Sequence, residues 1–229
     1  MRSTRRNIFF LGLPIAAAAI SIFVAAIEVL PASSEINFHD NFSTGKLEAW
    51  QFPFPDDWEV KEEGTLHFLH MIRNRQPLIP RRPQQFARIT RINVGSFTLE
   101  TRMRREGRSL LIAFDYIDTL HFYYAHLSVD SGAQADVHNG IFLVNGGARR
   151  RIAGIEAAPA LPDKNWHKVR VERDVNSGSI KVFVDGEPQP RFFVVDHTLH
   201  CGQVGLGSFD ETGDFADVKL SSKGGGCRP

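Results

Sequence analysis

Between residues 36 and 220, the chain consists of short stretches in which apolar and polar residues alternate, and none of them has the periodicity of a helix. Side chains of a β-strand point alternately to its two faces, so this alternation predicts strands with one buried face. Phe97, Leu99 and Met103, for example, share a face of one stretch. Glycines such as Gly178, which readily adopts a positive φ, separate neighbouring stretches as hairpin turns would. The pattern predicts an all-β sandwich or barrel.

The remaining strands are expected at regular spacing in one domain, without an internal repeat. They cover residues 109–114, 120–129, 141–144, 168–173, 180–184, 204–209 and 215–220. The segment 76–85 is expected to be a loop, because its three prolines cannot donate to a sheet ladder.

Composition excludes several classes of protein. The 229 residues hold 27 Lys and Arg against 26 Asp and Glu, without a basic stripe. A nucleic-acid partner is not expected, because such binding depends on neutralising phosphates. The ordinary hydrophobic content of 42% argues against disorder. The two cysteines are too few for a disulfide-dense scaffold or a four-cysteine zinc site.

Residues 1–34 are predicted to be a signal peptide or a signal anchor. Three arginines precede an apolar run from Ile8 to Ile27, and small residues follow at Ala32 and Ser34. These are the parts of a secretory signal, although the run is also nearly long enough to span a bilayer as a helix. Either reading predicts a secreted, periplasmic or cell-surface protein, in contact with a membrane only if the segment stays uncleaved. Without residues 1–34 the formal charge changes from +1 to −1, which suits uncharged glycans better than polyanions.

Export also bears on the two cysteines, Cys201 and Cys227. In an oxidising compartment such a pair usually forms a disulfide. The bond would attach the C-terminal tail, which contains three consecutive glycines, to the sheet. The alternative is two independent thiols.

Four segments near the C-terminus resemble a known superfamily: Trp166–Arg173, Ser179–Gly186, Gly202–Phe209 and Phe215–Val218. Further matches are Phe38–Phe42, Trp58–Val60, Gly64–Leu66, Phe114–Tyr116 and Phe122–Leu127. In order and spacing they resemble the concanavalin A-like lectin/glucanase superfamily, in its laminin-G-like bacterial branch. The resemblance implies an antiparallel two-sheet jelly roll over residues 35–221, with a concave sheet that offers a groove, followed by a flexible tail at 222–229.

This superfamily includes lectins, carbohydrate-binding modules, family-sixteen glycoside hydrolases and 3-keto-disaccharide hydrolase domains, so fold alone does not decide activity. The Glu-x-Asp-x-x-Glu strand of the family-sixteen enzymes is absent, and so are the strand motifs of the 3-keto-disaccharide hydrolases. The favoured interpretation is therefore an exported lectin-like module that binds an oligo- or polysaccharide. The alternatives are a glycoside hydrolase, with Asp115 as the best candidate acid or base, and a structural protein.

The densest group of polar and aromatic residues predicts where a glycan would bind. Tyr124 and His126 share a strand face opposite Tyr123, whose side is expected to face the core. Aromatic rings stack on sugar CH faces, and polar side chains hold hydroxyls. We therefore expect Tyr124 and His126 in the groove, with Asp115 and His138 as neighbours. The alternative is that the aromatic residues fill a core.

Arginines supply further candidates. Arg104 alternates onto the polar face of its strand and is included among the expected carbohydrate-binding residues. The run Arg149–Arg151 follows two glycines, where it could bind an acidic glycan through bidentate pairs or form a solvated hairpin end.

The resemblance also implies a structural calcium between the first and last strands. Asp40 and Asp217 lie near those strands, and carboxylates are the hard oxygen ligands that calcium prefers. The alternative is that both aspartates cap turns.

Overall fold

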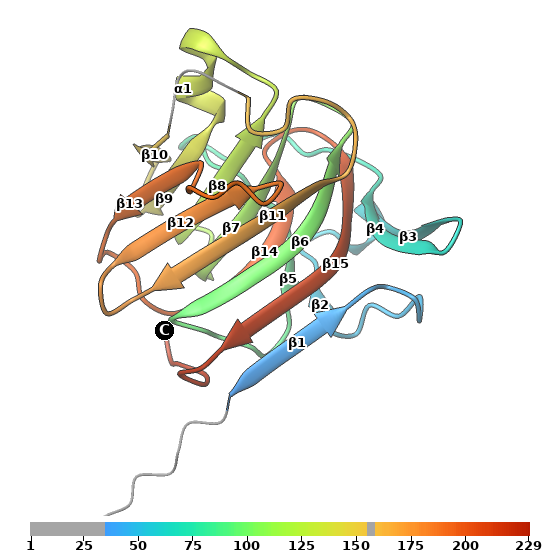
Figure 1. Cartoon of the computed structure of the whole chain (residues 1–229), viewed down its shortest axis with the longest axis horizontal. Helices are drawn as coiled ribbons and strands as arrows, with labels where there is room; N and C mark the ends of the chain where they lie inside the picture. The colour runs from blue at the N-terminus through green and yellow to red at the C-terminus, as the bar shows by residue number, and fades with distance from the viewer. Residues whose placement is uncertain (1–34, 155–158) are drawn as a thin grey trace, which may run out of the picture. The chain divides into compact units, whose positions relative to one another are not determined.

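Two antiparallel sheets packed face to face make up the protein, as the computed structural model of residues 35–154 and 159–229 shows (Figure 1). The predicted all-β, two-sheet architecture is confirmed. The signal or anchor segment 1–34 lies outside the described residues. Within the described ranges, no helix has the length and apolar character needed to cross a membrane.

The eight-stranded sheet has the order β13-β12-β11-β6-β15-β4-β3, with β1 beside β15. Its strands are β1 (Ile36–Asp40), β3 (Trp58–Glu63), β4 (Leu66–Met71), β6 (Phe97–Arg105), β11 (His167–Asp174), β12 (Ser179–Val184), β13 (Phe192–Val195) and β15 (Gly213–Ser222). The first strand and the last thus pair, which places the two ends of the domain side by side.

The seven-stranded sheet has the order β10-β9-β8-β7-β14-β5-β2. Its strands are β2 (Trp50–Gln51), β5 (Gln85–Ile89), β7 (Ser109–Asp118), β8 (His121–Ser128), β9 (Gly140–Asn145), β10 (Arg150–Ala153) and β14 (Gln203–Ser208). Short helical turns lie outside the sheets: η1 (Pro55–Asp57), η2 (Gly132–Gln134) and α1 (Ala135–His138).

The main hydrophobic core lies between the sheets. Phe97, Leu99 and Met103 of β6 belong to it, and so does Tyr123 of β8, on the face that alternation predicts. Alternate residues of β6 consequently point away from the core. We call the surface formed by such residues of β1, β4, β6, β11, β12 and β15 the eight-stranded face.

A second hydrophobic cluster covers the opposite side of the molecule, on the outer surface of the seven-stranded sheet. We call this surface the seven-stranded face. The cluster consists of Phe86, Leu111, Ala113, Tyr116, Phe122, Tyr124, Phe142, Val144 and Phe209. Arginines lie over its rings: Arg81 and Arg149 over Phe209, and Arg88 over Tyr116. The rings and the arginines above them therefore form a second, smaller core on the outer side of this sheet.

The C-terminal segment is attached to the rest of the domain. Cys201 and Cys227 form a disulfide. The Cys227 N–H donates to the Asn93 carbonyl at 3.1 Å, and Gly226 forms a β-bridge with Val94. Residues 222–227, expected as part of a flexible tail, are thus held against the domain.

Candidate functional site

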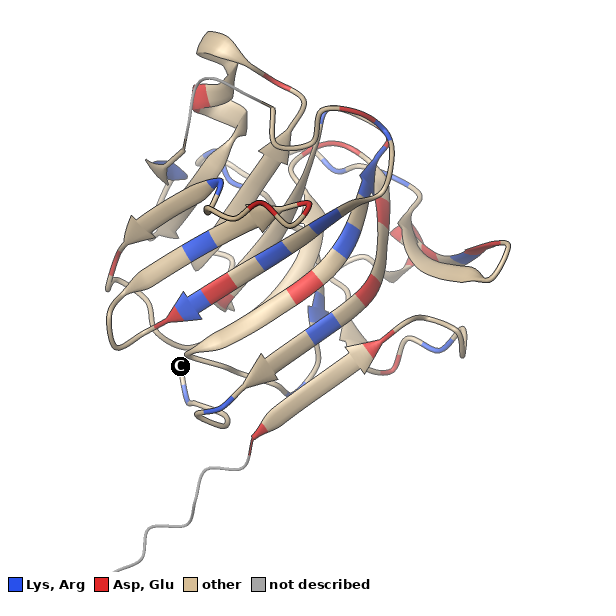
Figure 2. Ribbon diagram, in the orientation of Figure 1, with Lys and Arg blue, Asp and Glu red and all other residues tan. Residues whose placement is uncertain are grey.

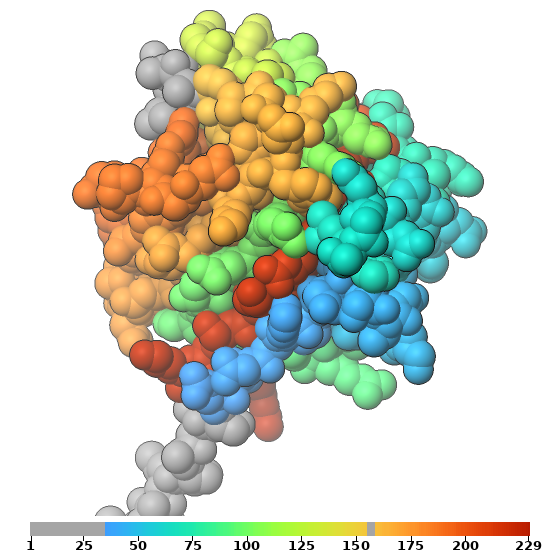
Figure 3. Space-filling view, turned by 45° about the vertical axis from the view of Figure 1, so that its right-hand side comes forward, coloured from blue at the N-terminus to red at the C-terminus, as the bar shows by residue number. Residues whose placement is uncertain are grey.

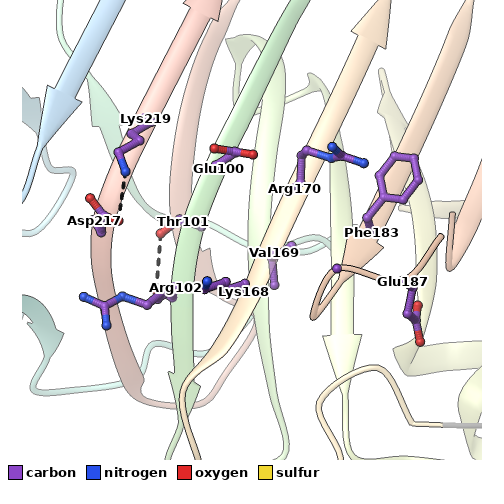
Figure 4. A pocket seen from close by; sticks show the side chains of 11 residues that line it. Glu100, Thr101, Arg102, Lys168, Val169, Arg170, Phe183, Glu187, Asp217 and Lys219 are labelled. Atoms are coloured by element: carbon purple, nitrogen blue, oxygen red, sulfur yellow. Dashed lines mark hydrogen bonds and ion pairs between the residues drawn. The ribbon is translucent and has the colours of Figure 1, made fainter. Parts of the chain in front are cut away.

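Three adjoining depressions lie on the eight-stranded face. The first has a volume of about 310 Å³. Its lining residues are Glu100, Thr101, Arg102, Lys168, Val169, Arg170, Phe183, Gly186, Glu187, Asp217 and Lys219 (Figure 4). The second depression shares Glu100 and Lys219 with the first, and the third shares Arg102 and Asp217 with it. Together they form one open, polar surface that runs from β12 to β1, and Figure 3 shows its middle strands β6 (green) and β15 (red) reaching the exterior.

Charge alternates across this face, as the blue and red bands on β6, β11 and β15 in Figure 2 show. Glu100 of β6 is the register partner of Arg170 on one side and of Lys219 on the other. Opposite charges directly across neighbouring strands stabilise a sheet. This row therefore places one carboxylate between two cations.

Aromatic rings border the charged row. Arg170 lies 4.1 Å above the ring of Phe183, which leaves only 8% of Phe183 exposed. Trp166 precedes β11, remains partly exposed, and meets the edge of Phe68 with 5.5 Å between ring centroids. Trp166 thus places accessible apolar surface next to hydrogen-bonding groups, the combination that suits a sugar ring, whereas Arg170 covers Phe183.

Arg104, predicted from the sequence as a binding residue, lies on the eight-stranded face. Its guanidinium donates to Asp214 and to Glu63, each at 2.7 Å, and lies 4.6 Å from the Trp166 ring centroid. Arg104 therefore borders the candidate surface, with much of its hydrogen-bonding capacity already engaged.

One group of side chains has the composition of a metal site: His70, Glu106 and Asp214. Both carboxylate oxygens of Asp214 are engaged, one with His70 Nδ1 and one with Arg104 Nε, each at 2.7 Å. The positive charge of Arg104 opposes a second cation at this position. We therefore interpret the group as an ion-pair network. Its members come from three distant segments, and no motif in the sequence indicated them.

The two aspartates implied as calcium ligands have other partners. Asp40 accepts hydrogen bonds from the backbone N–H of Phe42 and the indole N–H of Trp50, both at 2.7 Å. Asp217 interacts with His39 Nε2 at 2.9 Å and with the Lys219 ammonium at 3.1 Å. Partial burial opposes the effect, but these two partners hold the pKa of Asp217 below its ordinary value. Because Lys219 supplies the positive charge at Asp217, these residues do not fit a calcium ion.

Asp115 is not accessible to a substrate, contrary to the expectation from sequence. A bulge in β7 between Phe114 and Asp118 places its carboxylate 3.1 Å from Arg173 of the facing sheet. Both side chains are completely buried. Burial raises the pKa of Asp115 to about 6, although Arg173 acts in the opposite direction. The pair crosses the core and joins the two sheets.

Tyr124 and His126 do share a strand face opposite Tyr123, but that face is closed. Both side chains are 0% exposed. Tyr124 stacks on Phe142 with 5.1 Å between centroids, and one Arg149 nitrogen lies 3.1 Å from the Tyr124 hydroxyl and 3.2 Å from His126 Nδ1. Burial, followed by Arg149, lowers the pKa of His126 well below its ordinary value. The expectation that they line an open groove is wrong, because Arg149 and its neighbours cover them.

His138 ends the short helix α1 at the edge of this closed region, where 27% of its side chain is exposed. Its Nδ1 is 2.5 Å from an Asp130 oxygen, and its ring lies 5.5 Å from the ring of His126. The arginine run is divided: Arg149 covers the aromatic cluster, Arg151 pairs with Asp136, and Arg150 is exposed. The three arginines therefore form neither a single anion-binding group nor a single solvated hairpin end.

Comparison with known proteins gives a fold but no close relative. No family model and no curated protein matches the chain. The carbohydrate-binding module CBM66 from Bacillus subtilis resembles it with 18% identity and a TM-score of 0.53, over 76% of this chain and 96% of that one. Lectin I from Ulex europaeus, solved with a methyl glycoside of α-L-fucose, has 13% identity and a TM-score of 0.51, over 82% and 98%. The xylan β-1,4-xylosidase from Bacillus halodurans C-125 has 14% identity and a TM-score of 0.55, over 80% of this chain and 39% of the enzyme. The chain thus has the concanavalin A-like jelly-roll fold.

Proposed function

We propose that this protein is an exported carbohydrate-binding module, and that it binds an oligo- or polysaccharide on the eight-stranded face. The observation that carries the proposal is the set of three adjoining depressions, which are lined by carboxylates, guanidinium groups and ammonium groups, with the partly exposed Trp166 ring on the same face. The fold supports it, because the similar structures include a carbohydrate-binding module and a lectin solved with a fucoside.

The chemistry of the face suits sugar hydroxyls. Charged side chains form stronger hydrogen bonds than neutral ones, and Glu100 with its neighbours Arg170 and Lys219 offers both acceptors and donors in one row. Trp166 offers an apolar surface at the end of the face. The strands hold these groups in fixed register, so a sugar meets a preorganised surface and less free energy is spent on ordering side chains.

Hydrolysis is the weaker alternative. Cleavage of a glycosidic bond requires two carboxyl groups on either side of it, with different protonation states. Asp115, the sequence candidate, is buried against Arg173. Asp217 on the open face is held ionised by His39 and Lys219, which does not suit proton donation. Among the described residues, no observation favours a catalytic pair.

Export is proposed on the basis of the N-terminal segment and the cysteines. Residues 1–34 have the sequence pattern of a signal, and the Cys201–Cys227 disulfide suits an oxidising compartment.

The test is a glycan array of neutral and charged oligosaccharides probed with the purified protein, with parallel assay of the supernatant for released sugar. We expect binding without release, and at least a tenfold weaker affinity for Glu100→Gln, because a charged acceptor is lost. Asp136→Asn is the matched control, because it removes an exposed carboxylate from α1, which lies outside both sheets and lines none of the depressions. Failure to bind any glycan would contradict the proposal, and released sugar would favour the hydrolase.

A further inference from the structure

Two positively charged residues occupy directly opposite positions on neighbouring strands in the first depression. Arg102 of β6 and Lys168 of β11 are direct register partners, and both line the depression. Figure 4 shows the two residues on neighbouring strands, one row away from Glu100 and Arg170, with the Arg102 guanidinium directed toward the strand of Asp217. Like charges directly opposite each other destabilise a sheet, so this position calls for a compensating anion.

No ion pair in the described part of the chain supplies such an anion. Neither the Arg102 guanidinium nor the Lys168 ammonium makes a hydrogen bond or an ion pair in residues 35–154 and 159–229, and Arg102 Nε is buried without a partner. The nearest aromatic contact is the Trp166 ring, whose centroid lies 5.9 Å from the Arg102 guanidinium carbon.

Two of the three acidic residues that line the depression form ion pairs with cations of their own. Asp217 interacts with His39 and Lys219, as described above. Glu187 pairs with Arg191. Glu100 lies between Arg170 and Lys219 in the register of the sheet. Four cationic side chains against three carboxylates line the depression, so it keeps a net positive charge, and no ion pair engages Arg102 or Lys168.

We propose that the juxtaposed Arg102 and Lys168 form an anion subsite, and that the glycan recognised on this face carries carboxylate or sulfate groups. This inference rests on the proposed carbohydrate-binding function and specifies its ligand class. A guanidinium presents a planar fork of donors that matches a carboxylate or a sulfate, and an adjacent ammonium adds a second charge. The near-neutral overall charge of the protein favours uncharged glycans, but a bound glycan interacts mainly with the charges near it, and those of Arg102 and Lys168 are positive.

The test is titration calorimetry with three oligosaccharides of equal length: an oligogalacturonate, a sulfated galactan oligosaccharide and an uncharged galactan oligosaccharide. We expect the protein to bind at least one charged oligosaccharide about tenfold or more tightly than the uncharged one. Raising the NaCl concentration from 50 to 500 mM should weaken binding of the charged oligosaccharide, because salt screens exposed charges. Comparison of the first two ligands distinguishes a carboxylate from a sulfate.

Variants locate the subsite. Arg102→Gln and Lys168→Gln should each lower the affinity for the charged oligosaccharide about tenfold and leave affinity for the uncharged one unchanged. Arg102→Lys, which keeps the positive charge, should lower the affinity for the charged oligosaccharide less than Arg102→Gln does. Arg150→Gln is the control, because it removes an exposed arginine from β10 in the other sheet. The melting temperature of Arg102→Gln should not fall, since the substitution relieves repulsion.

The outcomes separate the two proposals. Equal binding of charged and uncharged oligosaccharides would refute the anion subsite and leave the carbohydrate-binding function standing. Tighter binding of charged ligands that both glutamine variants retain would also refute the subsite at Arg102 and Lys168. If no oligosaccharide binds, the proposed function fails, and the inference fails with it.

Discussion

Replacement of Tyr124 by alanine distinguishes the two faces of the sandwich as binding surfaces. Tyr124 is completely buried in the cluster on the seven-stranded face, stacked on Phe142 and next to Arg149. If this position is core, Tyr124→Ala creates a cavity and leaves Arg149 without one of its acceptors. The variant should then lose stability while glycan affinity, measured well below its melting temperature, stays unchanged.

The expected loss follows from the burial of the ring. Truncation of a fully buried large aromatic residue to alanine costs about 3–5 kcal/mol. For a domain of this size, that loss lowers the melting temperature by roughly 6–20 °C. Tyr124→Phe keeps the ring and removes the hydroxyl at 3.1 Å from Arg149, so it should cost only about 1 kcal/mol.

The assay combines urea denaturation, followed by tryptophan fluorescence, with calorimetric titration of the glycan found on the array. Tyr124→Phe serves as the control for the ring itself. If Tyr124→Ala leaves the denaturation midpoint unchanged but weakens glycan binding, Tyr124 is open to ligand. That result would refute the placement of the binding surface on the eight-stranded face.

Two further predictions concern the interior and the C-terminus. Replacement of Cys201 and Cys227 by alanine removes the disulfide, whose two cysteines have a sequence separation of 26. The chain-entropy model predicts that the free energy of unfolding then falls by about 3.5 kcal/mol. A fall of less than about 1 kcal/mol in chemical denaturation would contradict this prediction. Because the pKa of Asp115 is raised to about 6 in the folded state, folded protein retains a proton that the unfolded chain releases above about pH 4. The contribution of Asp115 to stability is therefore complete below about pH 4 and is lost as the pH rises through 6. Asp115→Asn should consequently flatten the pH dependence of the unfolding free energy between these pH values. An unchanged slope in the variant would contradict the raised pKa of Asp115.

The prediction of Tyr124 as a groove residue shows where sequence reasoning reached its limit. Alternation correctly separated Tyr123, which faces the core between the sheets, from Tyr124, which points the other way. It gave no information about what lies above Tyr124, because the covering residue Arg149 comes from another segment. A period of two assigns a side chain to one face of a strand and leaves the environment of that face open.

The prediction for Asp115 was wrong because of a local irregularity in its strand. A uniform alternation cannot locate a bulge, and the bulge in β7 sets this side chain against Arg173. The implied calcium site was limited in another way. The resemblance placed Asp40 and Asp217 near paired strands, and β1 does pair with β15. The lysine and the indole that these carboxylates contact became visible only in three dimensions.

The sequence by itself determined most of the strands and their inward faces, because these depend on local periodicity, and it left open whether the two cysteines pair. Only the tertiary structure decided which outer face is closed and which is open, because a second layer of residues from distant segments covers one sheet and not the other. It also decided that Arg102 and Lys168 lie opposite each other. Strand register fixes that neighbour relation, and register depends on the packing of the whole sheet.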